Sequence, residues 1–79
     1  MKVLVQDKHT KKYLTAEGSW TAKADDAEDF LFTARAYDIA VSRVRGPFRV
    51  VFHSSSLGYS INILDGNGQA VETVTAQAA

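Results

Sequence analysis

One segment of the chain carries apolar residues at helical spacing, and it runs from about Asp26 to Arg45. The stripe that recurs every three or four residues is typical of a helix face packed on a core, and it comprises Ala27, Phe30, Ala34, Tyr37, Val41 and Val44. Asp26 is the expected N-cap of this helix, with Asp25 as the alternative. Gly46-Pro47 is its expected stop, because proline cannot continue the helical hydrogen-bond ladder. The sequence therefore predicts one helix about 30 Å long.

A second apolar stripe lies on nearly the opposite side of the predicted helix, where a small surface helix should be polar. It comprises Phe32, Ala36 and Ile39, and the charged residues Glu28, Arg35 and Arg43 flank it. Apolar anchors surrounded by charge are typical of protein interfaces. The alternative is that a loop or strand of the same chain covers this side of the helix. The sequence leaves both interpretations open.

The remaining segments have the patterns of strands. They are residues 3–5, 12–15, 48–53, 59–63 and 70–75. Asp65-Gly66-Asn67-Gly68 contains both Asp-Gly and Asn-Gly, so a hairpin turn is expected between the last two strands. The order β-β-α-β-β-β predicts an α+β fold, with an antiparallel sheet of about five strands and one long helix packed on one face. A single domain is expected over residues 1–75, followed by a frayed tail at 76–79.

Composition narrows the setting of the protein. The 79 residues include no cysteine, so the domain must be stable without disulfides, which favours the cytoplasm. The apolar run Val3-Leu4-Val5 is shorter than the roughly 7–15 residues of a signal-peptide core. No segment approaches the roughly 20 apolar residues that span a bilayer. A cytoplasmic protein without a membrane segment is therefore expected.

The charged residues are balanced in number but uneven in position. Nine basic and nine acidic side chains cancel, whereas nucleic-acid-binding domains usually carry a basic surplus. The residues that could contact nucleic acid are Lys8, Lys11 and Lys12 in one loop, and Arg43, Arg45 and Arg49 near the helix end. They would form one phosphate-facing patch only if the fold brings the two groups together. Nucleic-acid binding is therefore the alternative function and not the leading one.

Residues with catalytic or ligand-binding chemistry are few. His9 and His53 are the only histidines, and no cysteine is present to complete a zinc site. Ser54-Ser55-Ser56 follows His53, but neighbouring residues on a strand point to opposite faces, so a nucleophile–base pair is not expected. The carboxylates Asp25, Asp26, Glu28 and Asp29 would lie in an exposed first helical turn. The sequence thus predicts no enzyme, no catalytic residue, no metal, no cofactor and no small-molecule ligand.

The first half of the chain also carries a set of four packing motifs. These are Lys12-Tyr13-Leu14, Gly18-x-Trp20, Ala27-x-x-Phe30 and a small-residue helix through Ala34, Ala36 and Ala40. In this pattern the chain resembles small bacterial single-domain proteins of unknown function. The resemblance implies a similar fold and a bacterial cytosolic setting, and it implies no activity or site residue.

The leading functional prediction is a non-enzymatic protein-interaction module that binds another protein or a second copy of itself. Its expected interface is the outer helix face, formed by Phe32, Ala36, Ile39, Arg35 and Arg43. A homodimer is one form that such an interaction could take, and an unpaired sheet edge offers a second route to it.

Overall fold

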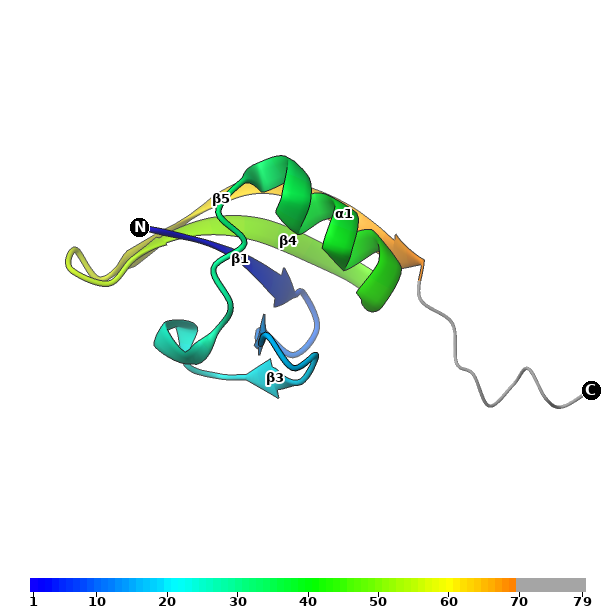
Figure 1. Ribbon diagram of the computed structural model, residues 1–79, viewed down its shortest axis with the longest axis horizontal. Coiled ribbons are helices and arrows are strands. Elements are labelled where there is room, and N and C mark those ends of the chain that lie inside the picture. The colour runs from blue at the N-terminus through cyan, green and yellow to red at the C-terminus, as the bar shows by residue number, and fades with distance from the viewer. Residues whose placement is uncertain (70–79) are drawn as a thin grey trace, which may run out of the picture.

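The protein folds as one antiparallel sheet with an α-helix on one face, as the computed structural model shows for residues 1–69 (Figure 1). The strands are β1 (Lys2–Asp7), β2 (Tyr13–Leu14), β3 (Trp20–Thr21), β4 (Arg45–Ser54) and β5 (Tyr59–Gln69). The helices are a 3₁₀ turn, η1 (Ala24–Asp26), and α1 (Thr33–Arg43). The sheet order is β3-β2-β1-β4-β5. The predicted α+β class, with five antiparallel strands and one helix, is therefore confirmed.

The identity of the strands differs in part from the prediction. The strand that was not predicted is β3, which precedes the helix. The predicted strand at 70–75 and the predicted tail at 76–79 lie outside the described residues. The predicted hairpin turn at 65–68 is wrong, because these residues continue β5 and pair with residues 46–49 of β4. β4 begins at Arg45, earlier than expected, so the β4–β5 ladder extends through the Asp-Gly-Asn-Gly segment.

The α-helix is shorter than predicted, since it begins at Thr33 and contains 11 residues. Asp26, the predicted N-cap of the α-helix, lies in η1 instead, and the N-cap of α1 is Phe32. The segment 28–30 instead bonds to the sheet: the Glu28 amide donates to the Leu14 carbonyl (3.1 Å) and the Phe30 amide to the Val3 carbonyl (2.9 Å). The Phe30 amide can bond to β1 because β2 has only two residues and leaves the start of β1 without a neighbouring strand on that side. No helix in the described part of the chain is long and apolar enough to cross a membrane.

Small residues let α1 lie close to β5. Ala36 and Ala40 are fully buried on the sheet side of the helix. A Cβ added to Gly68 would overlap the Val44 carbonyl group at the end of α1, and one added to Gly66 would come within 2.8 Å of the Tyr37 ring of α1. The two glycines therefore permit α1 to pack closely on β5. This packing explains the glycines of the Asp-Gly-Asn-Gly segment, which the sequence pattern predicted to be a turn.

The sheet separates two apolar clusters. The larger one, between α1 and the sheet, comprises Val3, Val5, Leu14, Phe30, Ala36, Ala40, Val44, Phe48 and Val50. The smaller one, on the opposite face, comprises Leu4, Ala27 and Val51. The chain near η1 crosses this second face, where the Lys2 ammonium donates to the carbonyls of Asp25 (2.9 Å) and Ala27 (3.3 Å). Both faces of β1 are therefore covered.

Gly46-Pro47 belongs to β4 and does not form the helix stop that was predicted, because α1 already ends at Arg43. The Pro47 carbonyl accepts a hydrogen bond from the Lys8 amide (3.2 Å), so the backbone of Pro47 faces the end of β1. Its nitrogen, which has no hydrogen, therefore points away from β5. Proline is tolerated here because no hydrogen bond of the β4–β5 ladder is lost.

Candidate functional site

The predicted interface on the outer face of the helix is only partly exposed. Ala36 has no exposed surface and faces the sheet, and Ile39 is half-buried because it packs partly against the main core. The predicted helix faces were wrong because Ala27 and Phe30 of the predicted inner stripe precede α1, whereas Ala36 and Ala40 are the helix residues buried against the sheet. Phe32 remains exposed at 68%. Arg35 and Arg43 are also exposed, and both line a pocket described below.

A strained turn presents two apolar side chains just before α1. The Phe32 amide donates to the Phe30 carbonyl at 2.8 Å, which closes a three-residue γ-turn around Leu31. Leu31 has φ +72°, a conformation that is costly for a branched side chain and that is found where surrounding contacts enforce it. Leu31 is nevertheless 60% exposed. The turn therefore holds Leu31 and Phe32 outward on a strained backbone.

Asp29 is the contact that enforces this turn. One carboxylate oxygen, Oδ1, accepts hydrogen bonds from the Val3 amide (3.0 Å) and the Leu31 amide (2.9 Å). The Val3 hydrogen bond is the main cause that lowers the pKa of Asp29, with the Leu31 hydrogen bond and the nearby Lys2 charge adding to it against a partial burial that raises it. The ionised carboxylate thus joins the start of β1 to the turn.

Phe32 occupies a position where another residue type would stabilise the helix. It is the N-cap of α1, with the extended backbone (φ −128°, ψ 144°) that N-caps adopt, and its side chain makes no capping hydrogen bond. Ser, Thr, Asp and Asn are preferred at this position because their side chains accept a hydrogen bond from the first helical turn. Leu31 and Phe32 therefore break two local rules in succession, as is common at functional sites.

Two further exposed apolar side chains lie on the same side of the sheet. Ile61 is 50% exposed and pairs with Phe52, which packs against the main core, so Ile61 faces the α1 side. Tyr59, two residues earlier, shares this side and is 47% exposed. Figure 1 shows that the tip of the β4–β5 hairpin extends past the N-terminal end of α1, so the helix does not cover it. We call Leu31, Phe32, Tyr59 and Ile61 the apolar face.

The sheet register places the two parts of the apolar face at the same level. The Phe30 amide binds Val3, Val3 pairs with Phe52, and Phe52 pairs with Ile61. These four residues form one row across the sheet, and Leu31 and Phe32 follow directly after Phe30. Phe30 and Ile61 therefore lie at the same level of the sheet, although β1 and β4 separate them by three strand spacings of about 4.8 Å each.

β5 is also an open edge of the sheet. It is the last strand in the order of the described residues, and its 11 residues pair only with β4. Because backbone groups alternate in direction along a strand, the pairing register leaves the groups of Ser60, Asn62, Asp65 and Asn67 pointing outward. Native edges are usually protected by lysine, proline or short length, and β5 has no lysine or proline. Its one charged residue, Asp65, contacts Arg49 (3.8 Å) and Lys8 (3.6 Å).

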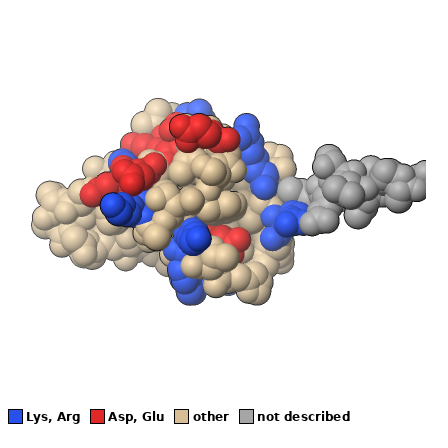
Figure 2. Space-filling model, turned by 90° about the horizontal axis from the view of Figure 1, so that it is seen from below, with Lys and Arg blue, Asp and Glu red and all other residues tan. Residues whose placement is uncertain are grey.

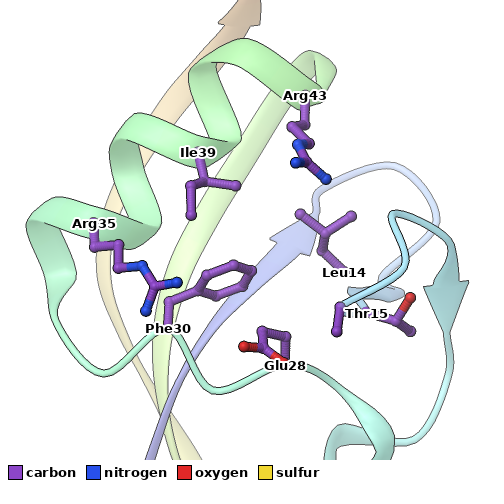
Figure 3. A pocket seen from close by; sticks show the side chains of 8 residues that line it. Leu14, Thr15, Glu28, Phe30, Arg35, Ile39 and Arg43 are labelled. Atoms are coloured by element: carbon purple, nitrogen blue, oxygen red, sulfur yellow. The ribbon is translucent and has the colours of Figure 1, made fainter.

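A separate pocket of about 130 Å³ lies between α1 and the segment at residues 14–16 (Figure 3). Its lining residues are Leu14, Thr15, Ala16, Glu28, Phe30, Arg35, Ile39 and Arg43. Figure 3 shows Arg43 above Leu14 at one end, with Arg35 beside Phe30 and Glu28 at the other. Sequence reasoning missed this pocket, since its residues come from three segments that only the tertiary fold brings together.

The predicted nucleic-acid contacts are brought together only in part. The turn that holds Lys8, Lys11 and Lys12 lies beside the start of β4, because the Lys8 amide bonds to Pro47. However, Lys8 and Arg49 contact the Asp65 carboxylate, and Arg49 lies on the sheet face opposite α1. Figure 2 shows basic side chains distributed over this face of the molecule, with acidic side chains beside some of them, and not a single basic patch.

The residues around His53 form a structural link between the β4–β5 hairpin and η1. His53 Nδ1 lies 2.8 Å from Ser60 Oγ, and its Nε2 lies 3.9 Å from Asp25 Oδ1, which is beyond hydrogen-bond distance. The Ser55 hydroxyl donates to the same Asp25 oxygen at 2.8 Å. Sequence spacing carried no signal for this cluster, because Asp25 and His53 are far apart in the chain.

Comparisons with known proteins add no relative. No protein-family model, no curated protein and no solved structure matches the chain. The resemblance to small bacterial proteins therefore stays a prediction, and the proposals that follow depend on the described residues alone.

Proposed function

We propose that this protein is a non-enzymatic interaction module that forms a homodimer through the β5 edge and the adjacent apolar face. The observation that carries this proposal is the turn at Leu31 and Phe32. The chain tolerates a strained backbone and an uncapped helix there while it exposes two large apolar side chains. Features that reduce the stability of the monomer are understandable if they serve a contact outside it.

A second copy of the chain is the occupant that best fits the β5 edge. An antiparallel strand is complementary to itself, so two β5 edges can pair about a two-fold axis perpendicular to the sheet. Such pairing would satisfy the outward backbone groups of β5 and join two five-stranded sheets. It would also place both α1 helices on the same side, with the Ile61 side chains of the two copies close together.

The charge distribution is compatible with this pairing. Asp65 is the one charged residue of β5, and its contacts with Arg49 and Lys8 lie on the sheet face opposite the apolar face. An antiparallel register centred near Asn62 keeps the two Asp65 carboxylates apart, which avoids the repulsion of directly opposed like charges.

The test is sedimentation equilibrium of the wild type and of Ile61→Lys over a broad concentration range. We expect concentration-dependent dimerisation of the wild type and a monomeric Ile61→Lys protein, because the substitution places a charge on the apolar face. Ala22→Lys is the matched control, since Ala22 is exposed and follows β3 at the other edge of the sheet.

A second variant separates edge pairing from contact through the face alone. Asn62→Pro removes an outward amide of β5 and leaves the amides that bond to β4 in place. We expect it to dissociate the dimer as Ile61→Lys does. A wild type that remains monomeric at about 1 mM, a concentration at which even weak specific dimers form, would overturn the proposal.

A further inference from the structure

We propose that the pocket between α1 and residues 14–16 binds a small organic carboxylate with an apolar body. The pocket is independent of the proposed dimer, because none of the four residues of the apolar face lines it. Its lining combines an apolar floor with charged side chains at its margins, as small-molecule sites commonly do.

The apolar part of the ligand would lie on three side chains. Phe30 and Leu14 are almost fully buried members of the main core, and Ile39 packs against that core from α1. They line the pocket without filling it, and a volume of about 130 Å³ remains. A cavity of about 150 Å³ holds one benzene molecule, so one ring or a branched chain of similar size fits here.

The carboxylate of the ligand would bind Arg43. Within residues 1–69 the guanidinium groups of Arg43 and Arg35 have no ion pair or hydrogen bond, and neither does the carboxylate of Glu28. Arg35 shares its end of the pocket with Glu28, whose charge offsets it, whereas Arg43 stands alone above Leu14 (Figure 3). A guanidinium presents two parallel N–H donors to a carboxylate, which suits it to this ligand class.

The charge of the lining favours a monoanion. Two arginines and one glutamate give the pocket a net charge of +1. Glu28 would repel a second negative group at the far end, so a dicarboxylate or a phosphate should bind less well than a monocarboxylate. It would accept a hydrogen bond from a hydroxyl or ammonium group there.

The first experiment is a titration of the ¹⁵N-labelled full chain with sodium benzoate, followed by amide chemical shifts. Benzamide is the neutral analogue of the same shape, and inorganic phosphate is the anion without an apolar body. We expect saturable benzoate shifts at residues 14–16, 28–30 and 35–43, with a dissociation constant on the order of 1 mM for a ligand of nine heavy atoms in an open pocket. Benzamide and phosphate should bind at least about fivefold more weakly.

The second experiment uses substitutions that remove one positive charge. Arg43→Gln should weaken benzoate binding by about tenfold, while Arg43→Lys, which keeps the charge but loses the two-pronged donor geometry, should weaken it less. Lys12→Gln is the matched control, because it removes the same charge from an exposed side chain outside the pocket. Its affinity for benzoate should equal that of the wild type.

Several outcomes would overturn the assignment. Equal binding of benzamide and benzoate would show that no anion is recognised, and equal binding of phosphate would show that charge alone is sensed. No localised shifts below about 20 mM benzoate would show that the pocket binds no such ligand. These comparisons use the wild type, so they remain decisive even if an arginine variant fails to fold. Sedimentation of Arg43→Gln reports on the proposed dimer separately.

Discussion

At the scale of single residues, Asp29 connects the start of β1 to the turn that precedes α1. It stands three residues after a predicted N-cap, in an acidic run that would suit the first turn of a helix. Its carboxylate instead holds the Val3 and Leu31 amides, which belong to a strand and a turn 28 residues apart. The geometry of the turn that exposes Leu31 and Phe32 therefore depends on one side chain.

The first residue-scale prediction concerns the pH dependence of stability at Asp29. A carboxyl whose pKa is lowered in the folded state stabilises the fold above its ordinary pKa of about 4, and this contribution is lost as the pH falls through the lowered value. Asp29→Ala should reduce the free energy of unfolding by about 2–3 kcal/mol at pH 7, because two amides lose a charged acceptor.

Urea unfolding at fixed protein concentration checks this prediction, with Asp29→Asn as the variant that retains an oxygen acceptor without the charge. The wild type should exceed Asp29→Asn in stability at pH 7, and this difference should shrink below about pH 4. A difference that is the same at about pH 3 and pH 7 would contradict a role for the ionised carboxylate.

The second residue-scale prediction separates stability from association at Phe32. Phe32→Ser should be more stable as a monomer than Phe32→Ala by about 1 kcal/mol, because serine can cap α1 and alanine cannot. Both variants should dimerise more weakly than the wild type, since each removes an exposed aromatic side chain of the apolar face. Chemical denaturation and sedimentation equilibrium measure the two effects. A variant that dimerises as tightly as the wild type would exclude Phe32 from the interface.

At the scale of elements, the contact between α1 and β5 is the one that requires particular residues on both sides. Gly68→Ala should destabilise the fold by about 3 kcal/mol or more, because the new methyl group meets the backbone of Val44, which cannot move without shifting the helix. Asn67→Ala is the neighbouring control and should change stability by less than about 0.5 kcal/mol, as its side chain is exposed. Thermal unfolding followed by circular dichroism measures both, and equal melting temperatures would rule out close packing at Gly68.

The length of α1 was also decided by its neighbours. The sequence from Ala27 onward does have helical periodicity in its apolar residues. However, Ala27 and Phe30 both precede α1: Ala27 belongs to the smaller cluster on the sheet face opposite α1, and Phe30 belongs to the main core between α1 and the sheet. Two segments with different conformations can share one helical spacing when both contribute to the core. Periodicity alone could therefore not place the start of α1 at Thr33.

At the scale of the whole molecule, the proposed dimer couples association to stability. A dimer that binds only folded chains raises the apparent melting temperature as protein concentration increases. The wild type should show this dependence and Ile61→Lys should not. Scanning fluorimetry over about a hundredfold range of concentration is the measurement. A melting temperature independent of concentration in both proteins would argue against the dimer.

The sequence by itself determined the class of the fold and most of its strands. Alternation in residues 48–53 and 59–63 identified the strands of the β4–β5 hairpin, because side-chain direction has a period of two in any strand. The absence of a long apolar run and the single helical segment were equally plain. These are local properties, and local sequence is sufficient to predict them.

Only the tertiary structure decided where the exposed features lie. Asp-Gly-Asn-Gly forms part of β5 because α1 packs against it, and residues 28–30 leave the helix because β1 lacks a neighbour there. The apolar face joins Phe32 to Ile61, and the pocket joins Leu14 to Arg43. The two residues of each pair are about 30 positions apart in sequence. The local sequence favoured a helix at residues 28–30 and a turn at residues 65–68, and contacts with distant segments decided the conformation of both.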